Sequence, residues 1–141
     1  MKYINKKLSV EKTNFHKIAQ KYNTPTYCYS YSKLKENITN FKKNFKSFSP
    51  LICFAVKSNT NLNLINEMRK FGLGADVVSV GEMMMALKAK INPKKIVFSG
   101  VGKTTDELNF AIDKKILLIN AESKSEVEEI NRIAKRKKRR V

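Results

Sequence analysis

The first 50 residues predict two helices separated by a strand. Apolar residues recur at helical spacing over residues 15–22, and the pair Thr24-Pro25 stops this pattern. Aromatic side chains alternate over Thr26–Tyr31, which predicts a strand. A second helix can begin at Ser32 as its N-cap, and its apolar stripe consists of Leu34, Ile38, Phe41 and Phe45.

From residue 51 onward, strand-like and helix-like patterns alternate with a period of a little over twenty residues. Each nearly continuous apolar run is followed by a segment with apolar residues at helical spacing. Gly72 closes one predicted helix, and Thr104–Glu107 and Ser123–Glu126 are capping signals for two others. The predicted strands are Leu51–Lys57, Ala75–Ser79, Ile96–Val101 and Ile116–Asn120, and the helices follow them around residues 62–71, 82–90, 105–112 and 124–133.

Apolar strands that alternate with amphipathic helices predict a parallel sheet covered by helices. A doubly wound sheet and a (β/α)8 barrel both fit this pattern. No G-x-G-x-x-G motif follows the first of these strands, which disfavours a dinucleotide-binding fold. Polar or special residues gather at the predicted carboxyl ends of the strands, which form the active-site face of a barrel, although any loop can begin with such residues. They are Lys57, Ser58, Asn59, Asp76, Ser79, Ser99, Gly100, Asn120 and Glu122.

Composition indicates a folded cytoplasmic protein. The chain has 141 residues, of which 42% are hydrophobic, enough for one domain with a real core. No apolar run approaches the roughly 20 residues of a membrane span, and the N-terminus has no apolar signal-peptide core. Cys28 and Cys53 lie in different predicted strands, so we expect reduced thiols.

The net charge of +17 first suggests a nucleic-acid partner. Seven of the 29 basic residues, however, lie among the last ten positions, which contain no acid, and without these ten the net charge is +10. The remaining lysines are scattered over the polar faces of the predicted helices. A basic arm at residues 135–140 for nucleic acid or an anionic membrane stays an alternative interpretation of this run.

Lys57 stands out because it ends the apolar run Leu51–Val56 and is followed by polar residues. A cation at the end of a buried strand suggests a Schiff-base lysine, because an amine held in apolar surroundings loses its proton more readily and becomes nucleophilic. The plain alternative is a strand that ends in a solvated lysine. In a chain with 29 Lys and Arg residues, that alternative fits most lysines.

Four segments resemble motifs of the pyridoxal-phosphate decarboxylases that act on diamino acids, an alanine-racemase-like barrel family. Thr24–Tyr29 resembles the TPxYVY entry of that family, and Phe54–Asn59 resembles its YAVKAN strand, whose lysine carries the cofactor. Gly74–Glu82 resembles GFDVVSGGE. Ile96–Thr104 is similar to the IVFSGVGKT motif of the meso-diaminopimelate branch, from which the ornithine and arginine branches usually differ. The agreement in order and spacing extends to about Ile133.

The resemblance implies the first half of a PLP-binding (β/α)8 TIM barrel, incomplete in this chain, with pyridoxal 5′-phosphate bound as a Schiff base to Lys57. Matching by residue places Asp76 near this linkage and Glu82 at the start of the next helix, near the mouth of the cofactor site. From the residues alone, Asp76 can equally cap a strand end, and Glu82 can complement a helix dipole. Val80 stands where the family usually has glycine, which puts the backbone beside Ser79 in question.

The implied reaction is the removal of carbon dioxide from meso-diaminopimelate to give L-lysine. The resemblance also implies a small amino-acid substrate and a cytoplasmic homodimer for the complete enzyme, without a metal. Decarboxylation of another diamino acid, such as ornithine, arginine or carboxynorspermidine, is the alternative within the family. A non-catalytic basic binding protein is the alternative outside it, and we expect neither a specific nucleic-acid partner nor a membrane partner.

The expected organisation has three parts. Residues 1–31 form a helix and a strand that in the family pack with a C-terminal β domain, residues 32–134 form the first four βα units of the barrel, and residues 135–141 form a basic tail. A complete barrel takes about 250 residues, so we expect a fragment that is inactive alone. The resemblance assigns the phosphate-binding glycines, the ring-stacking histidine and the catalytic cysteine to later segments, which His16, Cys28 and Cys53 do not match.

Overall fold

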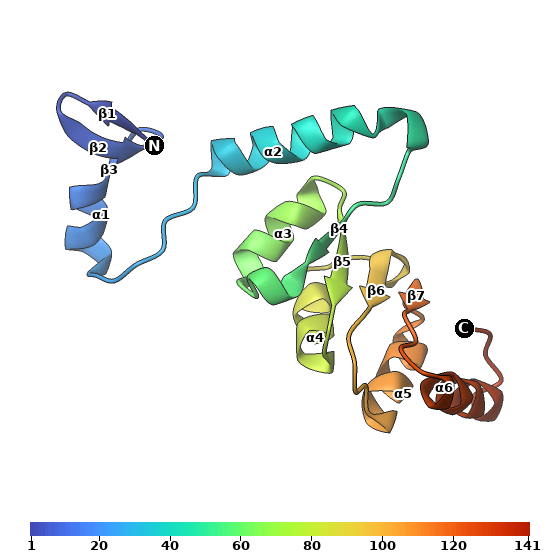
Figure 1. Cartoon of the computed structure of the whole chain (residues 1–141). Coiled ribbons are helices and arrows are strands. Elements are labelled where there is room, and N and C mark those ends of the chain that lie inside the picture. Colours follow the sequence, from blue (N-terminus) through green and yellow to red (C-terminus); the bar gives the residue numbers. More distant parts are fainter. The chain divides into compact units, whose positions relative to one another are not determined.

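A computed structural model describes all 141 residues, which form two compact units, Met1–Pro50 and Leu51–Val141. The first unit contains a small antiparallel sheet and two helices, and the second contains a parallel sheet with its helices (Figure 1). The boundary between these units follows Pro50, so the first unit also includes the second helix of the chain. The expected division between residues 31 and 32 stays a prediction.

The first unit begins with three short strands that pair in the order β1-β2-β3. Asn5 and Lys6 both have positive φ and form the two-residue turn between the first two strands, as expected for a tight hairpin. Two α-helices and a short 3-10 helix follow. The bounds are β1 Lys2–Ile4, β2 Lys7–Val10, β3 Thr13–Asn14, α1 Phe15–Tyr22, α2 Tyr31–Asn44 and η1 Lys46–Phe48.

Helix α1 confirms the helix predicted over residues 15–22, and helix α2 confirms the second with an earlier start. Ser30, rather than Ser32, is its N-cap, because the Ser30 hydroxyl accepts a hydrogen bond from the Lys33 N–H. Glu11 supports the same helix end by accepting a hydrogen bond from the Ser32 N–H at 2.7 Å. This bond and those from the serine hydroxyls lower the pKa of Glu11.

The strand predicted over Thr26–Tyr31 is wrong for this chain, because the segment joins no ladder. Two of its alternating aromatic side chains, Tyr27 and Tyr29, are 90% and 66% exposed. A strand needs partners and a buried face, and this segment has neither here. Strands β1 to β3 were not predicted, because their short and mostly exposed sequences lack a clear apolar alternation.

The second unit confirms the predicted alternation of strands and helices. All neighbouring strands of its sheet are parallel, and they pair in the order β4-β5-β6-β7. Short 3-10 helices, η2 Val56–Ser58 and η3 Pro93–Lys95, flank two of the strands. The bounds are β4 Cys53–Ala55, α3 Leu62–Lys70, β5 Gly74–Val77, α4 Val80–Lys88, β6 Ile96–Phe98, α5 Thr105–Lys114, β7 Leu118–Ile119 and α6 Lys124–Arg136.

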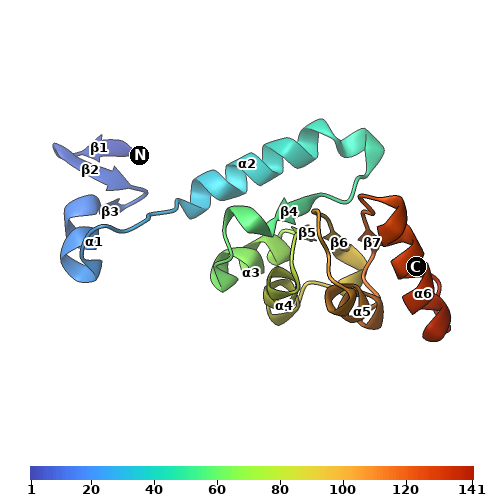
Figure 2. The same cartoon turned by 60° about the horizontal axis from the view of Figure 1, so that its bottom comes forward.

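The sequential strand order decides between the two architectures. A doubly wound sheet reverses its strand order and carries helices on both faces, whereas here the order never reverses and helices α3 to α6 lie on one face (Figure 2). This is the winding of a barrel. The second unit is therefore an α/β structure with four consecutive βα units of barrel type.

The core lies between this sheet and its helices. Side chains that point from the strands toward the helices are fully buried, among them Ala75, Val77, Ile96 and Phe98. The residues between them, such as Asp76 and Val97, are only partly buried. Because side chains alternate across a strand, Asp76 and Val97 lie on the face opposite the helices.

Three helices of this unit begin with the same capping arrangement. Thr104 and Glu107 form the predicted capping box of α5, in which each side chain bonds the backbone of the other residue. Ser123 caps α6 as predicted, and Ser79 caps α4 in the same way. Gly72, with φ of 80°, follows α3 and confirms the predicted glycine terminator.

The basic C-terminal run is partly ordered by contacts with α5. Helix α6 extends to Arg136, two residues into the segment expected as a tail. Lys137 pairs with Asp113 at 2.7 Å, and the Arg139 guanidinium donates hydrogen bonds to the carbonyl oxygens of Ile112 and Asp113. The two carbonyls that Arg139 contacts lie in the last turn of α5, where cations stabilise a helix end. Separately, the structure contains no helix long and apolar enough to cross a membrane.

Candidate functional site

Lys57 is the middle residue of the 3-10 turn η2, which follows β4 directly. Val56 before it is fully buried among the core residues, whereas the Lys57 side chain is exposed. The turn is fixed by the Ser58 hydroxyl, which donates to the Ala55 carbonyl at 2.7 Å, and by the Asn59 N–H, which donates to the Val56 carbonyl at 3.0 Å. The amine is therefore presented at the carboxyl end of β4 from a well-held backbone.

The surroundings of Lys57 differ from the apolar ones that the sequence predicted. Strand β4 ends at Ala55, two residues before Lys57, and the core closes at Val56. The helices cover the opposite face of the sheet, so nothing in the second unit buries the amine. What the sequence predicts correctly is the position of the lysine at a strand end, not its burial.

Three polar side chains form a hydrogen-bonded line across the carboxyl ends of the next strands. The Ser99 hydroxyl donates to Asp76 Oδ1 at 2.6 Å, and the Asn120 side-chain amide donates to Ser99 Oγ at 3.0 Å. The strand register explains this line, because Asp76 pairs with Val97, two residues before Ser99, and Val97 pairs with Leu118, two residues before Asn120. The predicted gathering of polar residues at one sheet edge is confirmed for these three.

Cys53 lies on the same strand as Ala55 and is half-buried near Asp76. Burial, followed by the negative charge of Asp76, raises the pKa of the Cys53 thiol. Its sulfur lies 3.9 Å from the Lys95 carbonyl oxygen, a weak contact for a thiol donor. Cys53 is therefore a protonated thiol at neutral pH, and the anionic group of this region is Asp76.

Glu82 lies in the first turn of α4, where its carboxylate accepts a hydrogen bond from the Val78 N–H at 3.0 Å. Its own N–H donates to the Ser79 hydroxyl at 3.2 Å, so the residue completes the start of its helix. Glu107 and Glu126 hold the corresponding positions of α5 and α6. With these contacts Glu82 stabilises the start of α4. A role of Glu82 near the cofactor stays a prediction.

Val80 adopts the first helical position of α4 without a positive φ. Its N–H donates to Glu107 Oε1 at 3.0 Å, which joins the starts of α4 and α5. Valine therefore does not disturb the backbone beside Ser79, because position 80 adopts an ordinary helical conformation and does not require glycine.

Lys103 is the residue at this edge that the sequence analysis did not single out. It lies in the loop between β6 and α5, and its side chain is only 1% exposed. The available signal was its place directly after Gly100-Val101-Gly102, since Gly100 and Gly102 both have positive φ and turn the loop sharply. The motif that Ile96–Thr104 resembles includes this lysine, but nothing in the segment indicates that its side chain is buried.

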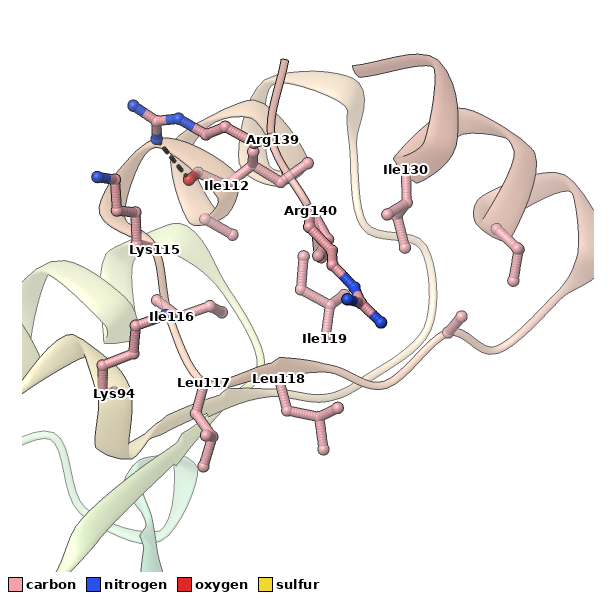
Figure 3. A pocket seen from close by; sticks show the side chains of 14 residues that line it. Lys94, Ile112, Lys115, Ile116, Leu117, Leu118, Ile119, Ile130, Arg139 and Arg140 are labelled. Carbon is pink, nitrogen blue, oxygen red and sulfur yellow. Dashed lines mark hydrogen bonds between the residues drawn. The ribbon is translucent and has the colours of Figure 1, made fainter. Parts of the chain in front are cut away.

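A separate groove of about 500 Å³ runs along the free edge of β7 (Figure 3). Ile112, Ile119 and Ile130 contribute to its apolar wall, and Arg139 and Arg140 also line it. Its lining includes no side-chain carboxylate, hydroxyl or thiol. Its charged side chains are lysines and arginines only. We place the candidate site at Lys57 and Asp76 instead, where a lysine and a carboxylate belong to neighbouring βα units.

Comparison with known proteins shows the family to which the chain belongs. Residues 31–141 match the family model described as pyridoxal-dependent decarboxylase, pyridoxal binding domain. Among curated relatives, diaminopimelate decarboxylase of Helicobacter pylori strain J99 is 46% identical over 121 residues, which cover 86% of this chain and 30% of the relative. The diaminopimelate decarboxylase of Aquifex aeolicus is 42% identical over 134 residues, which cover 95% and 31% of the two chains.

A solved structure gives the same result in three dimensions. The diaminopimelate decarboxylase of M. jannaschii in complex with L-lysine superimposes with a TM-score of 0.91 at 32% identity, over 95% of this chain and 32% of that one. The chain thus spans about a third of the length of the relatives it matches. Because the family model covers most of the chain and the sheet is wound as in a barrel, the chain belongs to the pyridoxal-dependent decarboxylases, and residues 31–141 match their pyridoxal binding domain.

Proposed function

We propose that the chain is the first part of the cofactor domain of an enzyme that removes carbon dioxide from meso-diaminopimelate to give L-lysine. The observation that carries the proposal is an exposed lysine at the carboxyl end of β4, one strand away from the carboxylate of Asp76. The carboxyl ends of barrel strands are where active sites of this architecture lie. An amine and a carboxylate at that edge suit a carbonyl cofactor and an amino-acid substrate.

The residues present fit the aldehyde end of pyridoxal 5′-phosphate. The Lys57 side chain is exposed, so its amine is accessible to a carbonyl group. When bound, this cofactor accepts the electron pair that departing carbon dioxide leaves behind. In this proposal Lys57 binds the cofactor covalently, Asp76 orients the amine, and Ser99 holds one oxygen of Asp76.

The substrate is proposed from the relatives, which are diaminopimelate decarboxylases at 37% to 46% identity. Ornithine, arginine and carboxynorspermidine stay alternatives. A complete enzyme assembled from this chain and the remaining length of its relatives would release carbon dioxide from meso-diaminopimelate under the proposal. Release from ornithine alone would contradict it.

The cellular setting is part of the same proposal. We expect a homodimer of the complete enzyme in the cytoplasm, where the free thiols of Cys28 and Cys53 stay reduced. Native mass spectrometry of the complete enzyme measures the first expectation directly, because a monomer and a dimer differ twofold in mass. A proposal of nucleic-acid binding gains no support, since Lys137 and Arg139 of the basic run are engaged with α5.

Cofactor trapping on the 141-residue chain tests the assignment of Lys57. The chain is incubated with pyridoxal 5′-phosphate, reduced with borohydride and mapped by peptide mass spectrometry. We expect the pyridoxyl group mainly on Lys57, because the nearby carboxylate of Asp76 favours a positive charge on the bound nitrogen and the turn η2 holds the lysine backbone in place. Lys124, whose side chain is 92% exposed, serves as the internal reference lysine.

The control variant is Lys57→Ala. It should lose the dominant label and leave the background on Lys124 unchanged. Equal labelling of Lys57 and Lys124 in the unmodified chain would show that Lys57 has no special reactivity, and would contradict the assignment.

A further inference from the structure

Lys103 is a buried cation in a chain whose other paired lysines reach solvent. Its side chain is 1% exposed, compared with 22% for Lys137 and 92% for Lys124. Burying an ammonium group is costly unless each of its hydrogens finds an acceptor. The position of Lys103 therefore calls for a specific set of partners.

All three ammonium hydrogens of Lys103 have an acceptor. Its Nζ donates to the carbonyl oxygens of Gly100 at 2.6 Å and Asn120 at 2.7 Å, and to Glu126 Oε1 at 3.1 Å. The ring of Phe98 lies below it, with 5.5 Å between Nζ and the ring centroid. Lys103 thus ties the loop after β6 to the end of β7 and to the start of α6.

Stability alone is a weak reason for this arrangement. A buried ion pair is often no more stabilising than well-packed apolar side chains of similar volume. What an apolar side chain cannot do is fix the Asn120 carbonyl in one place by a hydrogen bond. Asn120 is also the residue whose side-chain amide donates to Ser99, which in turn donates to Asp76.

We propose that Lys103 is a positioning residue that holds the Asp76 carboxylate through Asn120 and Ser99. The inference rests on the proposed function, which gives Asp76 its task beside the cofactor on Lys57. Lys103 fixes the backbone of Asn120, the Asn120 amide then fixes the Ser99 hydroxyl, and the hydroxyl fixes one oxygen of Asp76. Lys103 touches neither cofactor nor substrate in this scheme and acts only through the line of hydrogen bonds.

The line predicts a signature that requires no cofactor. In the NMR spectrum, Ser99→Ala should move the side-chain amide proton of Asn120 upfield, because the amide loses its acceptor. Lys103→Met should move the same resonance in the same direction, by at least half as much. The matched control is Lys137→Met, which removes another ion pair of α6 but lies outside the line, and it should leave the resonance in place.

An Asn120 resonance that stays in place in a folded Lys103→Met variant would overturn the proposal. Should Lys103→Met fail to fold, Glu126→Gln decides by the same criterion. Glu126→Gln removes the charge that pairs with Lys103 and keeps the shape of the residue 126 side chain. The proposal therefore requires the Asn120 resonance to move in this variant.

The second readout is the rate at which pyridoxal 5′-phosphate labels Lys57. Ser99→Ala and Lys103→Met should each lower this rate about fivefold, the factor that one hydrogen bond of ordinary net strength represents. The double variant should lose no more than either single one, because both act on the same carboxylate. Two results would contradict the proposal and indicate a merely structural role. One is a double variant whose labelling rate falls by the product of the two single effects, and the other is an equal fall of the rate in Lys137→Met.

The two readouts separate this inference from the function on which it rests. Absence of label on Lys57 in the unmodified chain would reject the proposed function, while the Asn120 resonance would still decide whether Lys103 holds the line. The opposite outcome is label on Lys57 in the unmodified chain together with an Asn120 resonance that stays in place in Lys103→Met. It would support the proposed function and reject the positioning role of Lys103.

Discussion

At the residue scale, the charge of Asp76 controls a neighbour whose reactivity can be measured directly. Cys53 has a raised pKa because of its burial and, secondly, because of the anionic Asp76. An anion nearby disfavours a second anion, so the thiol of Cys53 stays protonated to higher pH. The same effect gives an independent reading of the Asp76 charge without any cofactor.

We predict that Asp76→Asn lowers the pKa of Cys53 without returning it to that of a free thiol. The substitution removes the charge, but the burial that is the larger cause remains. The measurement is the alkylation rate of Cys53 by iodoacetamide as a function of pH, followed by peptide mass spectrometry. Cys28 in the same sample reports on the reagent, and an unchanged Cys53 profile in Asp76→Asn would contradict the prediction.

Gly74 is the second residue whose surroundings give a definite expectation. A Cβ at this position would lie 2.2 Å from the backbone oxygen of Lys95 and 2.8 Å from Cys53 Sγ. Since a backbone oxygen cannot move aside easily, Gly74→Ala should lower the free energy of unfolding by about 1–3 kcal/mol. Urea denaturation followed by circular dichroism measures this loss.

Gly81→Ala is the matched control for that variant. Gly81 lies in α4, and the nearest atom to its Cβ would be Ser79 Oγ at an ordinary 3.7 Å. Alanine favours a helix over glycine, so this variant should be neutral or more stable by up to about 1 kcal/mol. A Gly74→Ala protein as stable as Gly81→Ala would show that β5 and the Lys95 backbone can separate freely.

At the scale of elements, the start of α5 joins two βα units through one carboxylate. Glu107 accepts hydrogen bonds from the Thr104 N–H within its own cap and from the Val80 N–H at the start of α4. These backbone bonds lower its pKa, with those from Val80 the larger cause. The capping box is therefore also a contact between neighbouring helices.

The lowered pKa makes a part of the stability depend on pH. A carboxyl group whose pKa is lower in the folded state stabilises the fold above its unfolded pKa of about 4.3, and this contribution is lost as pH falls through the folded value. Glu107→Gln should cost about 1 kcal/mol at pH 7, and its difference from the unmodified chain should shrink below about pH 4.

Urea midpoints measured from pH 7 down to pH 3 check this expectation. Glu128→Gln is the control, because Glu128 is 68% exposed and its only ion pair, with Lys124, is 3.9 Å long. That variant should follow the unmodified chain at every pH. A constant difference between Glu107→Gln and the unmodified chain across the range would argue against a titrating cap.

The elements also show how far the sequence leads. Three local features were predicted: helix α1, the capping box at Thr104 and the terminator Gly72. Each is indicated by residues that lie close together in the sequence. The gathering of Asp76, Ser99 and Asn120 followed from the rule that parallel strands end at one edge. In both cases a general rule, applied to the pattern of each single helix or strand, was enough.

What the sequence could not predict depends on distant residues. The burial of Lys103 needs Glu126, which lies 23 positions away and meets it only through the packing of α6. The missing ladder at Thr26–Tyr31 and the exposure of Lys57 have the same origin, since partners and covering surfaces are tertiary features. Aromatic alternation shows that a strand is possible, not that a partner is present.

At the scale of the whole molecule, the parallel sheet has two free edges. Strand β4 pairs only with β5, and β7 pairs only with β6. Free edges present unpaired backbone groups and promote self-association, although the basic residues beside β7, such as Lys115 and Arg140, oppose it. The face that carries Lys57 and Asp76 is open as well, so water reaches the groups that the proposed chemistry uses.

The final prediction concerns the catalytic capacity of this 141-residue chain. We expect the purified chain with pyridoxal 5′-phosphate to release carbon dioxide from meso-diaminopimelate no faster than Lys57→Ala does. The electrostatic effects on which such catalysis depends are strong only where water is excluded, and the exposed Lys57 shows that water is not excluded here. A radiometric assay with carboxyl-labelled substrate measures the rate. Turnover that Lys57→Ala abolishes would contradict the prediction, and would mean that the four βα units close their open face around the cofactor, by self-association or by rearrangement.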